Sequence, residues 1–237
     1  KEFIFALAGN PNSGKTTLFN ELTGNHYQVG NWAGVTVESR EGICKYVFHD
    51  HSTHFDTHEH ESVHKHGEEH MHIKIVDLPG IYSLSPNSAE EVIARDYISG
   101  GRPDIILNIV DATNIERNLY LTTQIAEMGV PVIIALNMMD ALEKNGFSID
   151  ADLLEQTLGI PVMPISASKG RGIQDLVNRA LDIASKKQCA QPIVKYPAYI
   201  EQATTDLSEE LNISRFMVLK NLISEEFTSN TSNERIH

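Results

Sequence analysis

The segment GNPNSGKT at residues 9–16 constrains the fold of this chain more than any other stretch. It matches the pattern G-x-x-x-x-G-K-[ST], follows the apolar run at 3–8 and precedes a helix-like segment, TLFNELTG. Gly9 and Gly14 let the backbone curl, so that its N–H groups and the helix N-terminus surround phosphate oxygens. The pattern therefore predicts a strand, a phosphate-binding loop and a helix in succession.

The rest of the chain alternates strand-like and helix-like patterns. Buried strands are predicted by apolar runs at 73–78, 104–110, 130–137 and 160–166. Amphipathic helices are predicted at 88–99, 114–128 and 172–185, the first with Ser88 and Glu91 spaced as a capping box. Strands that alternate with helices predict an α/β fold with a mostly parallel, doubly wound sheet.

Several side chains suit a nucleoside triphosphate with magnesium. Lys15 is placed to reach the β- and γ-phosphates, and the Thr16 hydroxyl to bind Mg²⁺. In DLPG, which follows a strand-like run, Asp77 is expected to hold Mg²⁺ through water and Gly80 to sense the γ-phosphate. Thr36, in GVTVE, is the candidate second Mg²⁺ ligand, from a switch loop that becomes ordered only with the γ-phosphate present.

Two further motifs at strand ends indicate guanine as the base. In NMMD, the Asp140 carboxylate can accept two hydrogen bonds from guanine that adenine does not offer, and Asn137 would brace the loops. In SAS, the Ala167 N–H can donate to guanine O6. The complete predicted nucleotide-binding set is Gly9, Asn10, Pro11, Asn12, Ser13, Gly14, Lys15, Thr16, Thr17, Gly34, Val35, Thr36, Asp77, Leu78, Pro79, Gly80, Asn137, Met138, Asp140, Ser166, Ala167 and Ser168.

Together with VGNWAGVTVE, VDLPGIYSL and ERNLYLTTQIAEMGVPVIIALNMMD, these motifs resemble one family over residues 2–227. The family is the ferrous iron transport protein B (FeoB) family, and the resemblance is to its cytosolic N-terminal part. It implies a GTPase domain of the P-loop class followed by a small all-helical domain, both ahead of an iron-transporting membrane region of the same polypeptide. In the full-length protein these domains would lie at the cytoplasmic face of the cell membrane. The sequence leaves open whether the chain forms a homo-oligomer.

The domain boundary is expected near residue 190, where the strand-like runs stop. Residues 1–189 would form the GTP-binding domain and residues 190–237 the helical domain, with helices predicted at 196–211 and 213–227. The last segment does not close that helical region, so the sequence predicts an incomplete helical domain.

GTP hydrolysis by this chain needs a group other than the usual glutamine. Many GTPases follow DxxG with a Gln that orients the attacking water, but Ile81 stands there and can neither donate nor accept a hydrogen bond. The resemblance implies a K⁺ ion beside the phosphates, bound by the Asn12 side chain and the backbone carbonyls of Gly30 and Trp32. The predicted catalytic residues are Asn12, Lys15 and Thr36.

The stretch at 49–72 holds nine of the chain's eleven histidines and replaces the family's usual short turn. His72 lies five residues before Asp77, which puts it about 16 Å from the magnesium site. That distance excludes these histidines from GTP chemistry. Imidazole and carboxylate groups suit Zn²⁺, Fe²⁺ or Ni²⁺ without choosing among them, and the alternative is a solvated loop with no metal role. The candidate ligands are His54, His58, His60, His64, His66 and His70.

The net charge of −13 speaks against nucleic acid as a partner. The leading hypothesis is a slow, Mg²⁺- and K⁺-dependent GTPase that regulates a ferrous iron transporter. Two alternatives remain open, a GTP/GDP switch that does not hydrolyse and a metal-sensing module.

Overall fold

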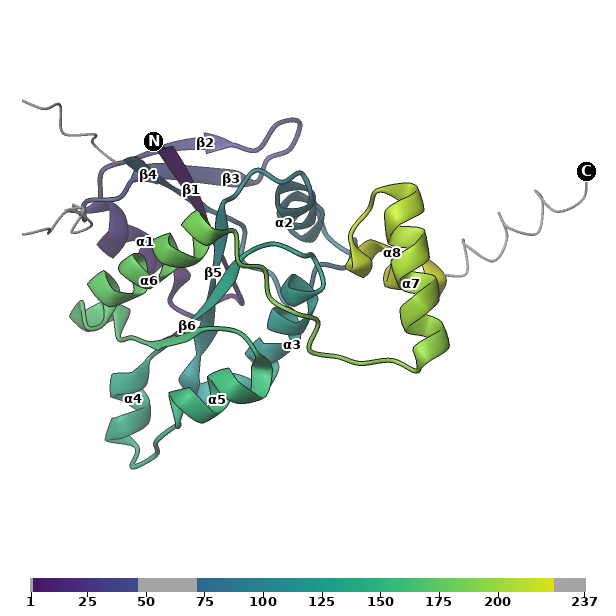
Figure 1. The fold of residues 1–237 in the computed structure, drawn as a ribbon. Helices are drawn as coiled ribbons and strands as arrows, with labels where there is room; N and C mark the ends of the chain where they lie inside the picture. Colours follow the sequence, from purple (N-terminus) through teal and green to yellow (C-terminus); the bar gives the residue numbers. More distant parts are fainter. Residues whose placement is uncertain (1, 47–71, 224–237) are drawn as a thin grey trace, which may run out of the picture.

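The computed structural model describes residues 2–46 and 72–223, built around one seven-stranded sheet (Figure 1). The strand order is β2-β3-β4-β1-β5-β6-β7. All five predicted strands are confirmed, and they form a parallel array of β1 (Glu2–Gly9), β4 (His72–Asp77), β5 (Ile105–Asp111), β6 (Val132–Asn137) and β7 (Val162–Pro164). The remaining strands, β2 (Tyr27–Asn31) and β3 (Glu38–Ile43), add an antiparallel edge next to β4.

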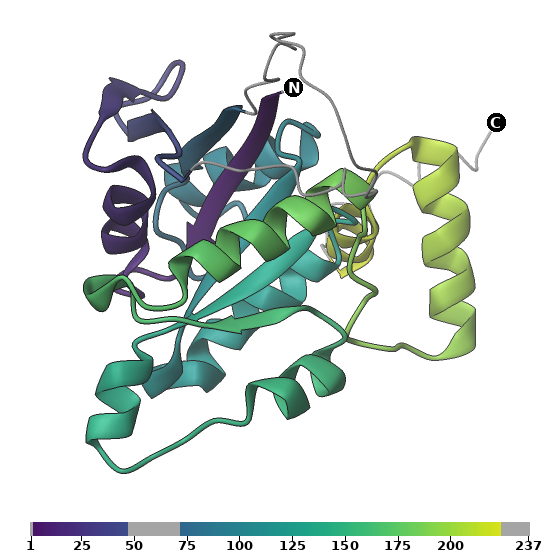
Figure 2. The ribbon, with the colours of Figure 1, turned by 60° about the vertical axis from the view of Figure 1, so that its left-hand side comes forward.

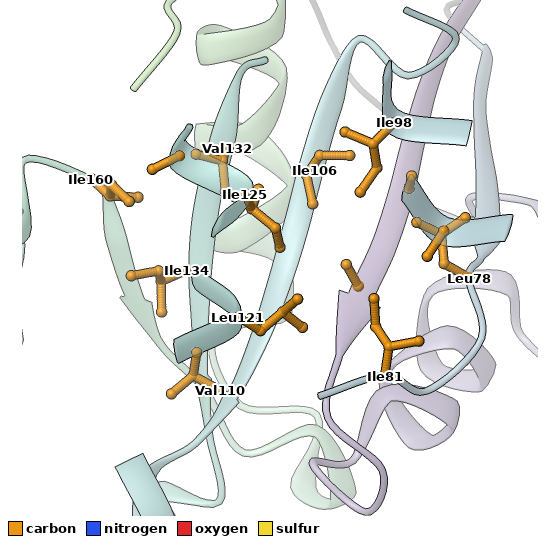
Figure 3. Close-up of a cluster of buried hydrophobic side chains, with 14 of the residues drawn as sticks. Leu78, Ile81, Ile98, Ile106, Val110, Leu121, Ile125, Val132, Ile134 and Ile160 are labelled. Carbon is orange, nitrogen blue, oxygen red and sulfur yellow. The ribbon is translucent and has the colours of Figure 1, made fainter. Parts of the chain in front are cut away.

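Helices cover both faces of the sheet because the buried strands are apolar on both sides. In β1, Phe5 and Leu7 face α1 (Lys15–Thr23) and α6 (Ile173–Lys186), whereas Ala6 and Ala8 face the opposite layer. That second layer holds α2 (Ala89–Ser99), α3 (Ile115–Ala126) and α5 (Ala151–Leu158). Figure 3 shows Ile98 of α2 next to Ile106 of β5, with Leu121 and Ile125 of α3 over the same face of the sheet. The predicted doubly wound α/β fold is confirmed.

Short elements lie at the strand ends. They are α4 (Met139–Lys144), η1 (Ala112–Asn114) and η2 (Ala167–Lys169). Half of the capping box predicted at the start of α2 is confirmed, because the Ser88 hydroxyl accepts the Glu91 N–H at 3.2 Å. The Glu91 carboxylate does not return to the Ser88 N–H and instead accepts from the Asn87 N–H at 3.2 Å and the Ser83 hydroxyl at 2.8 Å.

The C-terminal helices α7 (Ala198–Leu211) and α8 (Arg215–Ile223) lie beside the sheet domain (Figures 1 and 2). Arg215 forms ion pairs with Glu127, just after α3, and with Glu201 of α7. Burial raises the pKa of the Glu127 carboxyl, and the Arg215 guanidinium opposes that rise. In α8, Lys220 donates from Nζ to Ser85 Oγ at 2.8 Å. The α7–α8 pair is therefore fixed to α3 and to the segment that follows DLPG, and the boundary at residue 190 stays a prediction.

No helix in the described ranges combines the length and apolar content needed to cross a bilayer.

Candidate nucleotide site

The phosphate-binding loop joins the carboxyl end of β1 to the N-terminus of α1, as the sequence predicted. Asn12 and Gly14 both have positive φ, 66° and 90°, so the loop turns sharply just before α1, whose first N–H groups have no partner within the helix. Asn10 and Ser13 are buried, and Asn10 Oδ1 and Ser13 Oγ have no hydrogen-bond partner among the described residues. Such a backbone cradle suits an anion with several oxygens.

Lys15 and Asp77 come together across this loop. The Lys15 ammonium forms an ion pair with Asp77 at the end of β4, and the two side chains are only 10% and 9% exposed. One strand and one helix thus bring the cation for the phosphates next to the carboxylate assigned to Mg²⁺. The structure shows this spatial arrangement, and the roles of the two residues stay predictions.

The DLPG segment lies directly on the phosphate loop. The Ile81 N–H donates to the Gly9 carbonyl at 3.2 Å, and a Cβ on Gly80 would lie 3.5 Å from Pro11 Cα. Ile81 is 2% exposed and points into the core next to Leu78 (Figure 3). Its side chain is therefore a packing group, which agrees with its inability to orient water.

Asn137, at the end of β6, links the phosphate loop to the loop after β7. Its Nδ2 donates to the Ser13 carbonyl at 3.0 Å, and its Oδ1 accepts the Ala167 N–H at 3.0 Å. Gly14 packs against this amide so closely that a Cβ there would lie 2.2 Å from Asn137 Nδ2. The predicted bracing role of Asn137 thus has direct geometric support.

The residues assigned to the base gather at the same edge of the sheet. The Asp140 N–H donates to the buried Ser166 Oγ at 3.1 Å. Met138, which follows the last residue of β6, takes a positive φ of 64°. The Ala167 N–H, assigned to guanine O6, donates to Asn137 in this structure, and its role toward the base stays a prediction.

The switch loop, which carries the predicted Mg²⁺ ligand Thr36, makes its contacts outside the phosphate loop. Thr36 is exposed near the tip of the β2–β3 hairpin, where the Trp32 N–H donates to the Val37 carbonyl at 2.9 Å, and Gly30 pairs with Ser39. The Trp32 ring packs edge-on against Tyr97 of α2, with 5.3 Å between ring centroids. Within the described residues, no hydrogen bond joins Thr36, Gly30 or Trp32 to the phosphate loop. Their roles as Mg²⁺ and K⁺ ligands stay predictions.

The structure describes the predicted Mg²⁺ ligands but not the predicted histidine ligands. The described ranges contain no group of three or more His, Cys, Asp or Glu side chains arranged to hold a metal. Mg²⁺ in nucleotide sites takes most of its ligands from phosphates and water, so one carboxylate, Asp77, and one hydroxyl, from Thr16 next to Lys15, are a donor set that fits it. The six histidines proposed as divalent-metal ligands lie outside the described residues.

Two contacts beside the site were not predicted. Asn10 Nδ2 donates to the Arg117 carbonyl in the first turn of α3, at 3.3 Å. The Arg117 guanidinium lies 4.3 Å from the centroid of the Tyr82 ring, two residues after Gly80. The position of Tyr82 next to DLPG was the only signal in the sequence.

A phosphate loop after the first strand, a DxxG segment against it and an asparagine bracing the base loops define the P-loop GTPase fold. The sequence profile described as "Ferrous iron transport protein B" matches residues 3–57 and 54–180. The chain therefore belongs to the ferrous iron transport protein B family.

Related sequences and structures agree. The chain is 44% identical over 210 residues to the Fe(2+) transport protein A/Fe(2+) transporter FeoB fusion protein of Porphyromonas gingivalis, covering 87% of this chain and 22% of that relative. It spans a quarter or less of the curated relatives it matches first. A GDP-bound mutant of S. thermophilus NFeoB superposes with a TM-score of 0.76 at 43% identity, covering 94% of this chain and 80% of the other.

A second solved structure has the same fold. The cytosolic domain of the T. maritima FeoB iron transporter, in its apo form, has a TM-score of 0.79 at 34% identity and covers 100% of this chain and 88% of its own. The same T. maritima domain in a GMPPNP form also has a TM-score of 0.79.

The contact between Gly14 and Asn137 can be tested with a matched glycine. We expect Gly129→Ala to cost about 1–2 kcal/mol, since its φ of 69° strains any L-residue but nothing lies within 4 Å of a Cβ there. Gly14→Ala adds an overlap with Asn137, so its total cost should be about 3–4 kcal/mol. Denaturant unfolding of both variants checks this, and equal losses would contradict the close packing.

Proposed function

We propose that this chain binds GTP and GDP and hydrolyses GTP slowly, with Mg²⁺ and K⁺. The observation that carries the proposal is the Asn137 brace, which holds the phosphate loop and the Ala167 loop at one edge of the sheet. The S. thermophilus and T. maritima structures, solved with GDP or GMPPNP, support it.

In the proposed complex each residue acts on a defined part of the nucleotide. The phosphate-loop amides bind phosphate oxygens, and Lys15 exchanges its contact with Asp77 for the β- and γ-phosphates. Thr16 and Asp77 would hold Mg²⁺, which neutralises phosphate charge when bound. Asp140 accepts from guanine, and Gly80 offers its N–H toward the γ-phosphate.

Slow hydrolysis follows from the chemistry at position 81. A buried isoleucine orients no water, so charge stabilisation must come from elsewhere. We propose that Asn12 supplies a side-chain oxygen to K⁺ and that Gly30 and Trp32 supply carbonyls, with Thr36 reaching Mg²⁺. This requires the β2–β3 hairpin tip to move toward the phosphates when GTP binds.

The role in iron transport is proposed at the level of the whole polypeptide. The named relatives are Fe(2+) transporters, and this chain covers only a part of them. We propose that nucleotide state regulates a membrane transport region of the same polypeptide from its cytoplasmic face. The domain division at residue 190 and divalent-metal binding by the histidine-rich stretch belong to the same proposal. Neither nucleic acid nor an obligatory second copy is required.

The base assignment predicts the outcome of Asp140→Asn. An amide presents a donor where the carboxylate only accepts, so GTP affinity should fall and xanthine nucleotide affinity should rise relative to it. Titration of both nucleotides into wild type and variant gives the ratio. An unchanged GTP/XTP ratio would show that Asp140 does not read the base.

The potassium assignment predicts the outcome of removing the Asn12 amide. Because Asn12 has a φ of 66°, Asn12→Gly deletes the side chain without backbone strain, whereas Asn12→Ala adds strain. Both variants should keep GDP affinity within a few-fold and lose K⁺ stimulation over Na⁺, on the order of 10-fold in kcat. K⁺ stimulation that survives in Asn12→Gly sinks the assignment.

A further inference from the structure

Arg117 is a cation beside the phosphate site that the proposed mechanism does not use. Its side chain is exposed, and no carboxylate lies within ion-pair distance of it in the described ranges. In a chain with a net charge of −13, other cations pair with Asp or Glu, as Lys15 and Arg215 do. Arg117 instead lies over the Tyr82 ring at 4.3 Å, a cation–π contact of short range.

The same residue also contacts the phosphate loop. The Arg117 carbonyl accepts the Asn10 Nδ2 at 3.3 Å. The next residue, Asn118, is buried, donates to the Asn114 carbonyl at 2.8 Å and accepts the Asp111 N–H at 3.3 Å. The first turn of α3 is thus fixed to the end of β5, and these hydrogen bonds hold the backbone of Arg117 in place.

Within residues 2–46 and 72–223, no hydrogen bond or ion pair holds the Tyr82 side chain. It is 42% exposed, although its neighbour Ile81 is buried in the core. The segment from Gly80 to Tyr82 leaves the phosphate loop at the Ile81–Gly9 hydrogen bond, and the Arg117 guanidinium covers its outer end. Gly80, whose N–H is assigned to the γ-phosphate, comes directly before these two attachments in sequence, and a Cβ on it would lie 3.5 Å from Pro11 Cα.

We infer that Arg117 is a positioning residue, which holds the segment after Gly80 against the phosphate loop through Tyr82. It thereby favours the nucleotide that carries a γ-phosphate. This inference rests on the proposed function, since it assigns the γ-phosphate contact to Gly80. An exposed cation–π contact is worth about a two- to fivefold change in an equilibrium, so the effect is a bias and not a requirement for binding.

A double-mutant cycle on the whole chain tests the inference. The proteins are wild type, Arg117→Ala, Tyr82→Ala and the double variant, titrated with GDP and with GMPPNP and assayed for GTP hydrolysis. Each single variant should keep GDP affinity, lose about two- to fivefold in GMPPNP affinity relative to GDP, and show a lower kcat. The double variant should lose no more than the singles, because both remove the same contact.

Two controls separate the contact from general destabilisation. Tyr82→Phe keeps the ring and should behave as wild type. Lys45→Ala removes a cation that lies 5.4 Å from the Tyr46 ring, beyond the end of β3 and at the opposite edge of the sheet from the phosphate loop, and should leave the GMPPNP/GDP ratio unchanged.

Several outcomes would overturn the inference. They are additive losses in the double variant, equal losses of GDP and GMPPNP, no change in any variant, or a loss in Tyr82→Phe equal to that in Tyr82→Ala. A drop in kcat of about 10³-fold confined to Arg117→Ala would also overturn it, since that indicates a guanidinium acting directly on phosphate. Wild type that binds neither nucleotide contradicts the proposed function itself, and is thereby distinguished from failure of this inference.

Discussion

The two hydrogen bonds of the Asn137 side chain hold the candidate site together. One amide group joins Ser13 of the phosphate loop to Ala167 of the loop after β7, segments more than a hundred residues apart in sequence. The side chain is buried, so each of its bonds replaces one with water and is costly to lose. Gly14 permits this arrangement, because any side chain there would overlap the amide.

The sheet order explains why these segments meet. Parallel strands β4, β1, β5, β6 and β7 place their carboxyl ends at one edge, and the chain leaves that edge into the phosphate loop, DLPG, NMMD and SAS. The antiparallel hairpin of β2 and β3 lies outside this row and packs its Trp32 on α2. The phosphate and base loops are thus set by the core, whereas the switch loop has a contact that can be exchanged.

Much of this arrangement was readable from sequence, for physical reasons. Strands buried on both faces are continuous apolar runs, so β1, β4, β5 and β6 stood out, and glycine and lysine at fixed spacing identified the loop. β2 was missed because YQVGN is short, polar and exposed along most of its length. α5 was missed because none of its residues is fully buried.

The parts of the site that the sequence does not predict are contacts between segments distant in sequence. The Ala167 N–H was assigned to guanine, but its bond to Asn137 depends on how far β7 extends, which no local pattern encodes. Neither the Lys15–Asp77 ion pair nor the Arg117–Tyr82 contact follows from spacing, since each joins side chains brought together only by sheet order.

The central claim is that Asn137 unites the phosphate and base loops, and a second buried asparagine provides the comparison. Asn108 of β5 donates to the Ala8 carbonyl at 3.4 Å and accepts from Thr122, so Asn108→Ala also breaks two buried hydrogen bonds. The measurement is calorimetric titration of GDP with Mg²⁺ into wild type, Asn137→Ala and Asn108→Ala, each at a temperature where it is folded. We predict comparable losses of stability but at least a tenfold, or about 1.4 kcal/mol, loss of GDP affinity for Asn137→Ala alone. GDP affinity within twofold of wild type in Asn137→Ala, or an equal loss in Asn108→Ala, would contradict the account.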